Sequence, residues 1–386
     1  MNNKYKAIIL VIMVMLLPLS TQLFAGNRDR SGQAGAQELL IDPWARSAGW
    51  GTAGIAEIRG LESIYSNVAG ISFVNRLEVA FTRTQYMAGS RTGIGVNAAA
   101  ITIKLNKKDK KTGDVKDYGV LGLSMFLMNF GKIDITAVDQ PEGNLGTFSP
   151  NLLYIGVHYA KSFNRYIHGG VTGKIINESC GNMSATGFAF DVGIQYLSGP
   201  YENFKIGVTL KNIGLPMHYR GDGLAIRAIA TGADHEISLE QRSADCEMPA
   251  LIALGISYDF LFFGKEYASM TRKELKVEGL SRADAKHRLT LAGSFIANSY
   301  SHDQFSLGIE YGLGQIFMVR AGYLIEQGMW NSETSATFYT GPSAGVTVAI
   351  PMAKKGNGNQ KLFLDYGYRF TNKWGGNHYI GLKLAL

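Results

Sequence analysis

The chain has 386 residues, and its 38 Lys and Arg against 31 Asp and Glu give a net charge of +7. Charged residues make up only 18%, below the roughly 25% of an ordinary soluble domain. Glycine is frequent at 47 residues, proline is scarce at 9, and hydrophobic residues reach 46%. This balance excludes a disordered chain, collagen and a coiled coil, and the length leaves room for one large β-barrel.

The amino end has the pattern of a secretory signal peptide over residues 1–25. Lys4 and Lys6 precede an apolar run over 7–19, and Ala25 supplies a small residue for cleavage before Gly26. The run is too short for a transmembrane helix, and no later stretch approaches the roughly 18 consecutive apolar residues that a spanning helix needs. We therefore expect an exported protein that is soluble, surface-associated or a membrane barrel.

From about Arg76 onward, short segments alternate between apolar residues and small or polar ones. In 305–313 every second residue from Phe305 to Leu313 is apolar, and serine, glycine and glutamate lie between them. The segments 188–196 and 362–370 repeat this pattern, whose period of two is typical of β-strands. Because a soluble β-sandwich alternates in the same way, the period alone does not separate it from a membrane barrel.

Further features favour an all-β transmembrane antiparallel barrel in the cell outer membrane. The segments are about 9 to 12 residues long, as tilted spanning strands require, and aromatic residues gather toward their ends. The last segment, 378–386, places Ile380, Leu382, Leu384 and Leu386 on one face, like the terminal strand by which outer-membrane barrels are recognised. Its final residue is leucine where an aromatic residue is usual.

Counting the alternating segments predicts about 14 strands, an even number in the range of bacterial barrels. With both chain ends in the periplasm, the connections 130–149 and 214–245 become long outer loops. The charged connection 264–286 then lies in the periplasm, where it is best interpreted as a solvated helical excursion. The predicted strands lie near 76–87, 92–105, 115–129, 150–162, 165–178, 184–198, 203–213, 247–262, 286–299, 303–313, 315–328, 336–351, 360–371 and 376–386.

Residues 26–75 lack the alternation and precede the barrel, which we place at 76–386. This segment is rich in glycine and alanine and contains the runs 45–54 and 66–71. A segment of this size and composition fits an N-terminal plug, or hatch, folded into the lumen of the barrel. Inward charges of both signs are expected either to line an aqueous channel or to pair with the plug, and pairing is favoured because an unpaired buried charge is costly. They are Lys174, Asp191, Glu310, Arg320, Asp365, Arg369 and Lys383.

The plug segment also carries a family resemblance. Its run from Gly35 through Arg46, Gly49 and Gly51 to Asn67 and Gly70 resembles the PorV/PorQ family of FadL-like barrels from the Bacteroidetes type IX secretion system, closer to the PorV branch. The likeness continues through 122–126, 131–134 and 141–143 to Ala160. The chain departs from the family where Trp50-Gly51 replaces Met-Gly and where Asn67-Val68-Ala69-Gly70 lacks the usual proline.

The resemblance implies a 14-stranded barrel with an N-terminal plug that works as a component of protein secretion. Its implied partners are the large translocon barrel, the C-terminal signal domains of secreted cargo and the surface attachment complex, together with outer-membrane lipid. The implied function is to shuttle cargo from the translocon to the attachment complex. The alternative function is uptake of a hydrophobic small molecule through a FadL-like channel. Such a channel needs an apolar pocket at the plug and a lateral opening in the barrel wall.

No enzyme chemistry, cofactor or metal site is predicted. The run 49–54 matches G-x-G-x-x-G without the strand, helix and acid of a dinucleotide site, and 341–345 matches G-x-S-x-G where the chain continues as a strand beyond Ser343. The seven histidines show no paired spacing, which disfavours a zinc site. The basic run within 104–116 fits a solvated turn, so no nucleic-acid partner is expected.

Cys180 and Cys246 are the only two cysteines of an exported chain. The predicted topology places both at the outer ends of strands, where a disulfide would tie the long outer loop to the barrel. Closing such a loop stabilises a fold by about 2–4 kcal/mol. Two free thiols are the alternative interpretation.

Overall fold

The computed structural model describes residues 27–88, 93–108, 115–199, 201–229, 234–264, 282–331, 335, 337–352, 360–371 and 375–386. The predicted signal peptide and most of the predicted periplasmic excursion lie outside these ranges. No helix within the described ranges is both long and apolar enough to cross a membrane.

Fourteen long strands form one closed antiparallel barrel, which confirms the predicted fold and strand number. Each strand pairs with its neighbour in sequence, and the first strand closes on the last with the register Phe81↔Leu382. The strands are β1 Leu77–Gln85, β2 Gly95–Lys108, β3 Val115–Asn129, β6 Asn151–Ser162, β7 Ile167–Cys180, β8 Met183–Ser198, β9 Phe204–Gly214, β13 Leu251–Phe262, β14 His287–Asn298, β15 Gln304–Leu313, β16 Phe317–Glu326, β17 Gly341–Pro351, β18 Lys361–Arg369 and β19 Asn377–Ala385.

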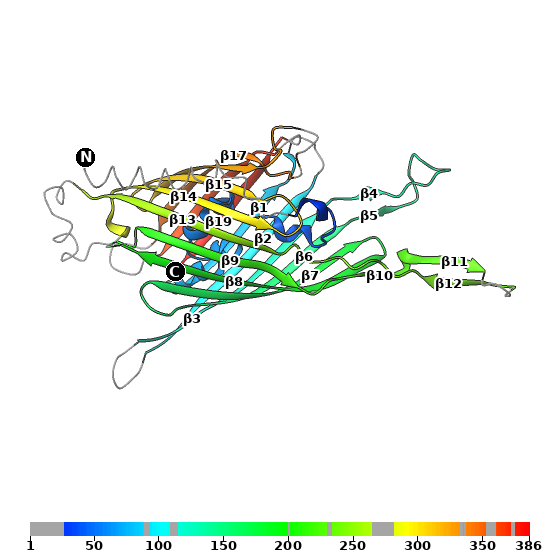
Figure 1. Ribbon diagram of the computed structural model, residues 1–386, viewed down its shortest axis with the longest axis horizontal. Coiled ribbons are helices and arrows are strands. Elements are labelled where there is room, and N and C mark those ends of the chain that lie inside the picture. Colours follow the sequence, from blue (N-terminus) through cyan, green and yellow to red (C-terminus); the bar gives the residue numbers. More distant parts are fainter. Residues whose placement is uncertain are drawn as a thin grey trace.

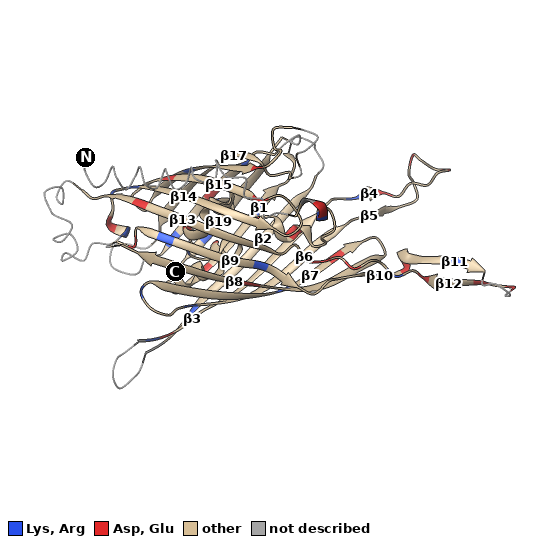
Figure 2. Cartoon of the chain, viewed as in Figure 1, with Lys and Arg blue, Asp and Glu red and all other residues tan. Residues whose placement is uncertain are grey.

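The apolar face of the strands points outward, the reverse of a soluble β-sandwich. On β8, Phe188 is 51% exposed and Phe190 61%, whereas the intervening Ala189 and Asp191 are buried inside. Figure 2 shows that long stretches of the strands carry no charge. An exposed apolar band around a closed barrel is stable only against lipid, so the protein is an outer-membrane β-barrel.

Two hairpins extend beyond one end of the barrel (Figure 1). One pairs β4 Ile133–Asp134 with β5 Thr147–Phe148, and the other pairs β11 Ala225–Ile229 with β12 Glu236–Glu240. The short β10 Tyr219–Arg220 adds to the edge of β8, and η7 Asp222–Leu224 precedes β11. We call this the hairpin end. The opposite end, where β19 finishes and η9 Arg282–Asp284 leads into β14, is called the C-terminal end.

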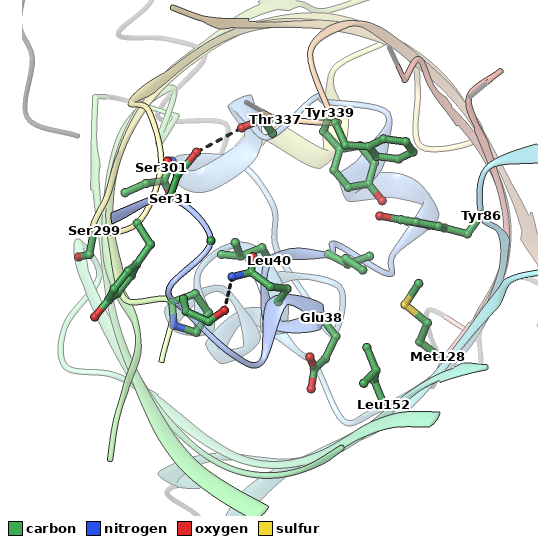
Figure 3. A pocket seen from close by; sticks show the side chains of 18 of the residues that line it. Ser31, Glu38, Leu40, Tyr86, Met128, Leu152, Ser299, Ser301, Thr337 and Tyr339 are labelled. Atoms are coloured by element: carbon green, nitrogen blue, oxygen red, sulfur yellow. Dashed lines mark hydrogen bonds between the residues drawn. The ribbon is translucent and has the colours of Figure 1, made fainter. Parts of the chain in front are cut away.

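The residues before β1 form short helical turns inside the barrel (Figure 3). These residues, 28–74, are called the N-terminal segment. It enters the lumen at the hairpin end, where Gly35 N–H donates to the Glu247 carbonyl, and leaves it at the C-terminal end as β1 begins. Its elements are η2 Arg28–Arg30, η3 Gln37–Leu40, α2 Ala45–Ala48, η4 Ala53–Ala56, α3 Ser63–Ser66 and η5 Val68–Phe73.

Candidate functional site

Inward-facing glycines of the barrel wall lie directly under the turns of the N-terminal segment. A Cβ added at Gly207 would lie 2.7 Å from the Ile55 carbonyl oxygen, and one at Gly367 would lie 2.6 Å from that of Ala45. Any side chain at these two positions would clash with the backbone of the N-terminal segment, so the wall requires glycine there. Backbone of the segment also lies against Gly170, Gly255, Gly322 and Gly345. At Gly193 and Gly308 the nearest atoms belong instead to the side chains of Asn67 and Trp50.

The glycines of the predicted plug motif serve the same close packing. A Cβ at Gly49 would lie 3.0 Å from the Gly345 Cα, and one at Gly70 would meet Ser63 Cβ at 2.6 Å. Gly51 has a φ of +60°, a conformation that disfavours other residues, and lies against Ser343. The motif glycines therefore set how tightly the segment folds and how closely it approaches β17.

The two polar residues of the motif bind in different ways. Asn67 caps η5 by accepting the Ala69 N–H at 3.1 Å, and its amide donates to the carbonyls of Ile194 on β8 at 3.0 Å and Val208 on β9 at 3.3 Å. It therefore ties the segment to two adjacent strands. Arg46 lies 3.8 Å from the Glu62 carboxylate, and both side chains are largely buried.

A chain of buried ion pairs fills the C-terminal half of the lumen. At its centre, Glu57 of the N-terminal segment pairs with Lys205 of β9, with Arg282, and with Arg288 of β14 at 3.3 Å. Burial raises the pKa of Glu57, but the charges of Arg282 and Lys205 outweigh it and lower that pKa to about 2. The Glu57 carboxylate therefore stays ionised and holds two basic groups from the wall, Lys205 and Arg288, and one from η9, Arg282.

The network continues around the wall toward the last strand. Arg288 and Arg320 both pair with Glu310, the latter at 2.9 Å, and Arg320 donates to Thr347 at 2.7 Å, which bonds Asp365. Lys383 of β19 then returns to the N-terminal segment through Glu62 at 2.6 Å. At this contact a lumen charge of the wall pairs with the N-terminal segment.

Three other predicted lumen charges lie outside this network of ion pairs. Lys174 pairs with Asp191 at 2.6 Å and donates to Asn212 at 2.9 Å. Asn212, with a φ of +58°, belongs to a bulge that shifts the register of β8 and β9 between Phe190 and Val192. Arg369 lies over the Tyr339 ring, 4.2 Å from its centroid, rather than in an ion pair among the described residues.

The hairpin half of the lumen is lined mainly by apolar side chains and contains a cavity of about 530 Å³. Figure 3 shows Tyr86, Tyr339, Met128 and Leu152 on one side of this cavity. The N-terminal segment forms its floor with Leu40 and Ile41. A cavity of this size and character can hold a small, largely apolar molecule.

One buried acid lies at the edge of the cavity. Glu38 is 1% exposed, and neither of its carboxylate oxygens has a hydrogen-bond donor among the described residues. Burial and the neighbouring Glu178 carboxylate raise the pKa of Glu38 to about 8. Glu178 itself accepts the Ala36 N–H at 2.9 Å and the Tyr219 hydroxyl, so it joins the N-terminal segment to β7 and β10.

The predicted disulfide is not formed. Cys180 and Cys246 are free thiols, each partly exposed. Cys180 of β7 is paired with Met183 of β8. Cys246 forms an isolated backbone bridge with Met217, and the Met217 side chain lies over Gly187 of β8. Met183 and Gly187 are 187 − 183 = 4 residues apart on β8, about 13 Å along a strand, and a disulfide needs Cα atoms within about 7 Å.

The rejected enzyme motifs have structural roles. Ser343 is a residue of β17, as predicted, and its hydroxyl donates to the Gly49 carbonyl at 3.2 Å. The run 49–54 links α2 to η4 within the N-terminal segment and follows no strand. No group of three or more potential metal ligands occurs among the described residues.

Sequence reasoning missed the cavity and the central role of Glu57. The sequence offered one signal for Glu57, which is an acidic residue in a segment otherwise rich in glycine and alanine. Its basic partners Lys205 and Arg288 lie on predicted strands of the wall. The cavity has no local signal, because its lining comes from the N-terminal segment and from loops and strands far apart in the chain.

No family model and no curated protein matches this chain. Among solved structures, a Pseudomonas aeruginosa FadL homologue superposes with a TM-score of 0.46 at 10% identity, covering 88% of this chain and 97% of that one. The CymD monoaromatic hydrocarbon channel gives 0.48 at 13% identity, covering 89% and 97%. The Ralstonia pickettii toluene transporter TbuX gives 0.45 at 12% identity, covering 89% and 97%. These likenesses are too slight to carry an argument about family or function.

Proposed function

We propose that this protein is an outer-membrane channel that takes up a small hydrophobic molecule. The observation that carries this proposal is the cavity of about 530 Å³ at the hairpin end, lined mainly by aromatic, methionine and aliphatic side chains. We place the hairpin end outside the cell and regard residues 26–75 as the plug. The channel is proposed to act without enzymatic chemistry and without a cofactor.

The N-terminal segment is proposed to be the gate of this channel. Below the cavity it blocks the lumen, because glycine contacts and ion pairs hold it against the wall. Around the cavity its contacts are mainly apolar side chains, together with the bonds of Glu178. A bound molecule that displaces these weaker contacts is expected to move 36–41 before it moves the ion-paired turns.

A cavity-narrowing double variant tests the uptake proposal. Met128 and Leu152 are directly opposite on β3 and β6 and face inward, whereas Met125 and Ile155 are opposite on the same strands and face lipid. Replacing Met128 and Leu152 by tryptophan should reduce uptake of naphthalene into proteoliposomes at least several-fold. The matched control replaces Met125 and Ile155 by tryptophan and should leave uptake unchanged. Equal uptake by both double variants would contradict the proposal.

The second candidate function is a component of type IX protein secretion, of the PorV branch, as the sequence resemblance implies. The observation that favours it is the exposed apolar surface of the β11–β12 hairpin, where Ile226 is 50%, Ile229 66% and Leu239 45% exposed. A two-stranded hairpin that projects from the barrel buries too little surface to be stable alone, which favours a protein partner. The partners would be the translocon barrel, cargo C-terminal signal domains and the attachment complex.

Affinity purification of the tagged protein from its native outer membrane tests this second function. Recovery of a very large barrel, or of exported proteins that share a C-terminal domain, would support secretion. A variant with residues 225–240 replaced by a glycine-serine linker should then lose these partners while the barrel still assembles. Recovery of the barrel alone, with a bound apolar molecule, would favour uptake.

A further inference from the structure

The cavity wall is divided into two chemically different sides. On the first side, Tyr86, Phe338 and Tyr339 pack against one another, with ring centroids 5.5 Å apart for Tyr86 and Phe338 and 5.3 Å apart for Phe338 and Tyr339. Met128 and Phe130 extend this side along β3 and just beyond it. Aromatic and thioether groups of this kind favour contact with a planar, polarisable molecule.

The second side carries neutral hydrogen-bonding groups. Figure 3 shows Ser31, Ser299 and Ser301 across the cavity from Tyr86 and Met128, with Thr337 between Ser301 and Tyr339. The Ser301 and Thr337 hydroxyls lie 3.4 Å apart, a weak contact that leaves the Ser301 hydroxyl able to bond a ligand. The Thr337 hydroxyl also bonds the Glu326 carboxylate, so it offers a ligand its remaining acceptor capacity. Hydroxyl groups can both donate and accept, so this side fits a hydroxyl or another uncharged polar group.

No basic side chain lines the cavity among the described residues, and its one carboxyl is Glu38. Two guanidinium groups contact lining residues and are engaged there: Arg30 pairs with Glu247 at 2.9 Å and stacks on Tyr300, while Arg369 stacks on the Tyr339 ring. A ligand carboxylate would lose its hydration here without gaining a cation among the lining residues.

We infer that the cavity selects an uncharged planar aromatic molecule bearing a hydroxyl or similar neutral polar group, and rejects the corresponding carboxylate anion. The ring would lie against Tyr86, Phe338 and Tyr339, and the polar group would reach Ser301 and Thr337. This inference rests on the proposed uptake function and specifies its substrate class.

The matched probes 2-naphthol and 2-naphthoate test this selectivity, because they share one ring system and only the second is charged at neutral pH. Binding is measured by calorimetry with the full-length protein in lipid nanodiscs. Since naphthol also enters lipid, cavity binding is the difference between the wild type and the variant with tryptophan at Met128 and Leu152. We expect naphthol to bind at least roughly tenfold more tightly than naphthoate, the order expected from an unpaired buried charge.

A charge-introducing variant sharpens the test. Ser301→Lys places an ammonium on the hydroxyl side and should raise naphthoate affinity at least several-fold, whereas the neutral control Ser301→Met should not. Equal binding of both probes to the wild type, or no gain for Ser301→Lys, would overturn the selectivity while leaving the cavity as a binding site. Binding of neither probe to the wild type would overturn the uptake function together with this inference.

Discussion

The two halves of the lumen hold the same N-terminal segment by different chemistry. In the C-terminal half, Glu57 and Glu62 meet basic groups from β9, β14 and β19, and wall glycines allow backbone to touch backbone. In the hairpin half, Leu39, Ile41 and Ala36 lie among aromatic and methionine side chains around a cavity. One half is tightly packed and charged, and the other is apolar and partly empty.

This difference shows how a barrel can be closed and still accept a ligand. Breaking a buried ion pair leaves an uncompensated charge and costs about 3–5 kcal/mol, so the C-terminal half resists opening. Displacing apolar side chains that line a cavity costs less when a ligand of similar character replaces them. Movement is therefore expected to begin in the hairpin half.

The largest expected effect comes from removing the charge at the centre of the ion-pair network. Glu57→Gln removes the carboxylate that Lys205, Arg282 and Arg288 share. Arg288 keeps Glu310, but Asp259, at 2.7 Å from Lys205 and 2.9 Å from Arg282, is then left to balance two buried cations alone. We expect the free energy of unfolding in lipid vesicles, measured by urea titration, to fall by about 3–5 kcal/mol. The same change should make the N-terminal segment sensitive to added protease. An unchanged unfolding curve would show that the two halves are held equally strongly.

A wall glycine should give the next largest effect. Gly367→Ala places a methyl group 2.6 Å from the Ala45 carbonyl oxygen, so backbone must shift, and overpacking of this kind costs about 1–3 kcal/mol. The matched control is Gly173→Ala on the lipid face of β7, where the nearest atom, of the Phe190 ring, lies 3.7 Å from the added group. Urea titration should separate the two variants, and equal losses would argue against a glycine-dependent contact.

The most gradual effect is expected from the pH dependence of Glu38, which changes stability by a small amount per pH unit and accumulates between pH 4.5 and 8. Because its pKa is raised from 4.5 to about 8 in the folded protein, folding takes up a proton between these values. The contribution of Glu38 to the free energy of unfolding is fully present below about pH 4.5. It declines as pH rises toward 8, by at most about 1.4 kcal/mol per pH unit. Acids and phenols that face Glu38 are Glu178 of β7, Tyr154 of β6 and Tyr219 of β10.

Glu38→Gln should remove this decline while keeping the shape of the side chain. Unfolding titrations at several pH values between 5 and 8 would measure it, with hydrogen exchange of 36–41 as a local readout. If the variant and the wild type lose stability in parallel as pH rises, Glu38 is not the responsible group. A decline confined to the wild type would locate the pH-sensitive contact in the hairpin half.

The strands were predictable because their pattern is local. Residues 188–196 alternate with period two whatever their partners are. The strand predicted at 184–198 differs from β8, Met183–Ser198, by one residue at its start and by none at its end. Export was predicted from an amino end that lies outside the described residues. The lipid-facing direction of the apolar face followed from segment length and aromatic placement. The prediction of 14 strands held because each strand carries its own signal.

The candidate site was predictable only in part. Residues of the plug motif, including Asn67 and Gly51, were singled out from composition and resemblance, but their partners on β8, β9 and β17 were not. The sequence left a disulfide and two free thiols open, because loop position along the chain does not give register across strands; the structure has the two free thiols. Cys180 and Cys246 lie at the same end of the barrel, but at different heights along β8. Cys180 is paired with Met183, whereas Cys246 is bridged to Met217 in the loop beside β8.

Local alternation and residue chemistry were thus enough to establish an exported, 14-stranded membrane barrel with charges facing inward. Closure of β1 on β19, the partners of Glu57 and the shape of the cavity depend on residues hundreds of positions apart, such as Glu62 and Lys383. A strand needs only its own period of two, whereas an ion pair or a cavity needs the registers of several strands at once. Those registers exist only when the barrel has closed around the N-terminal segment.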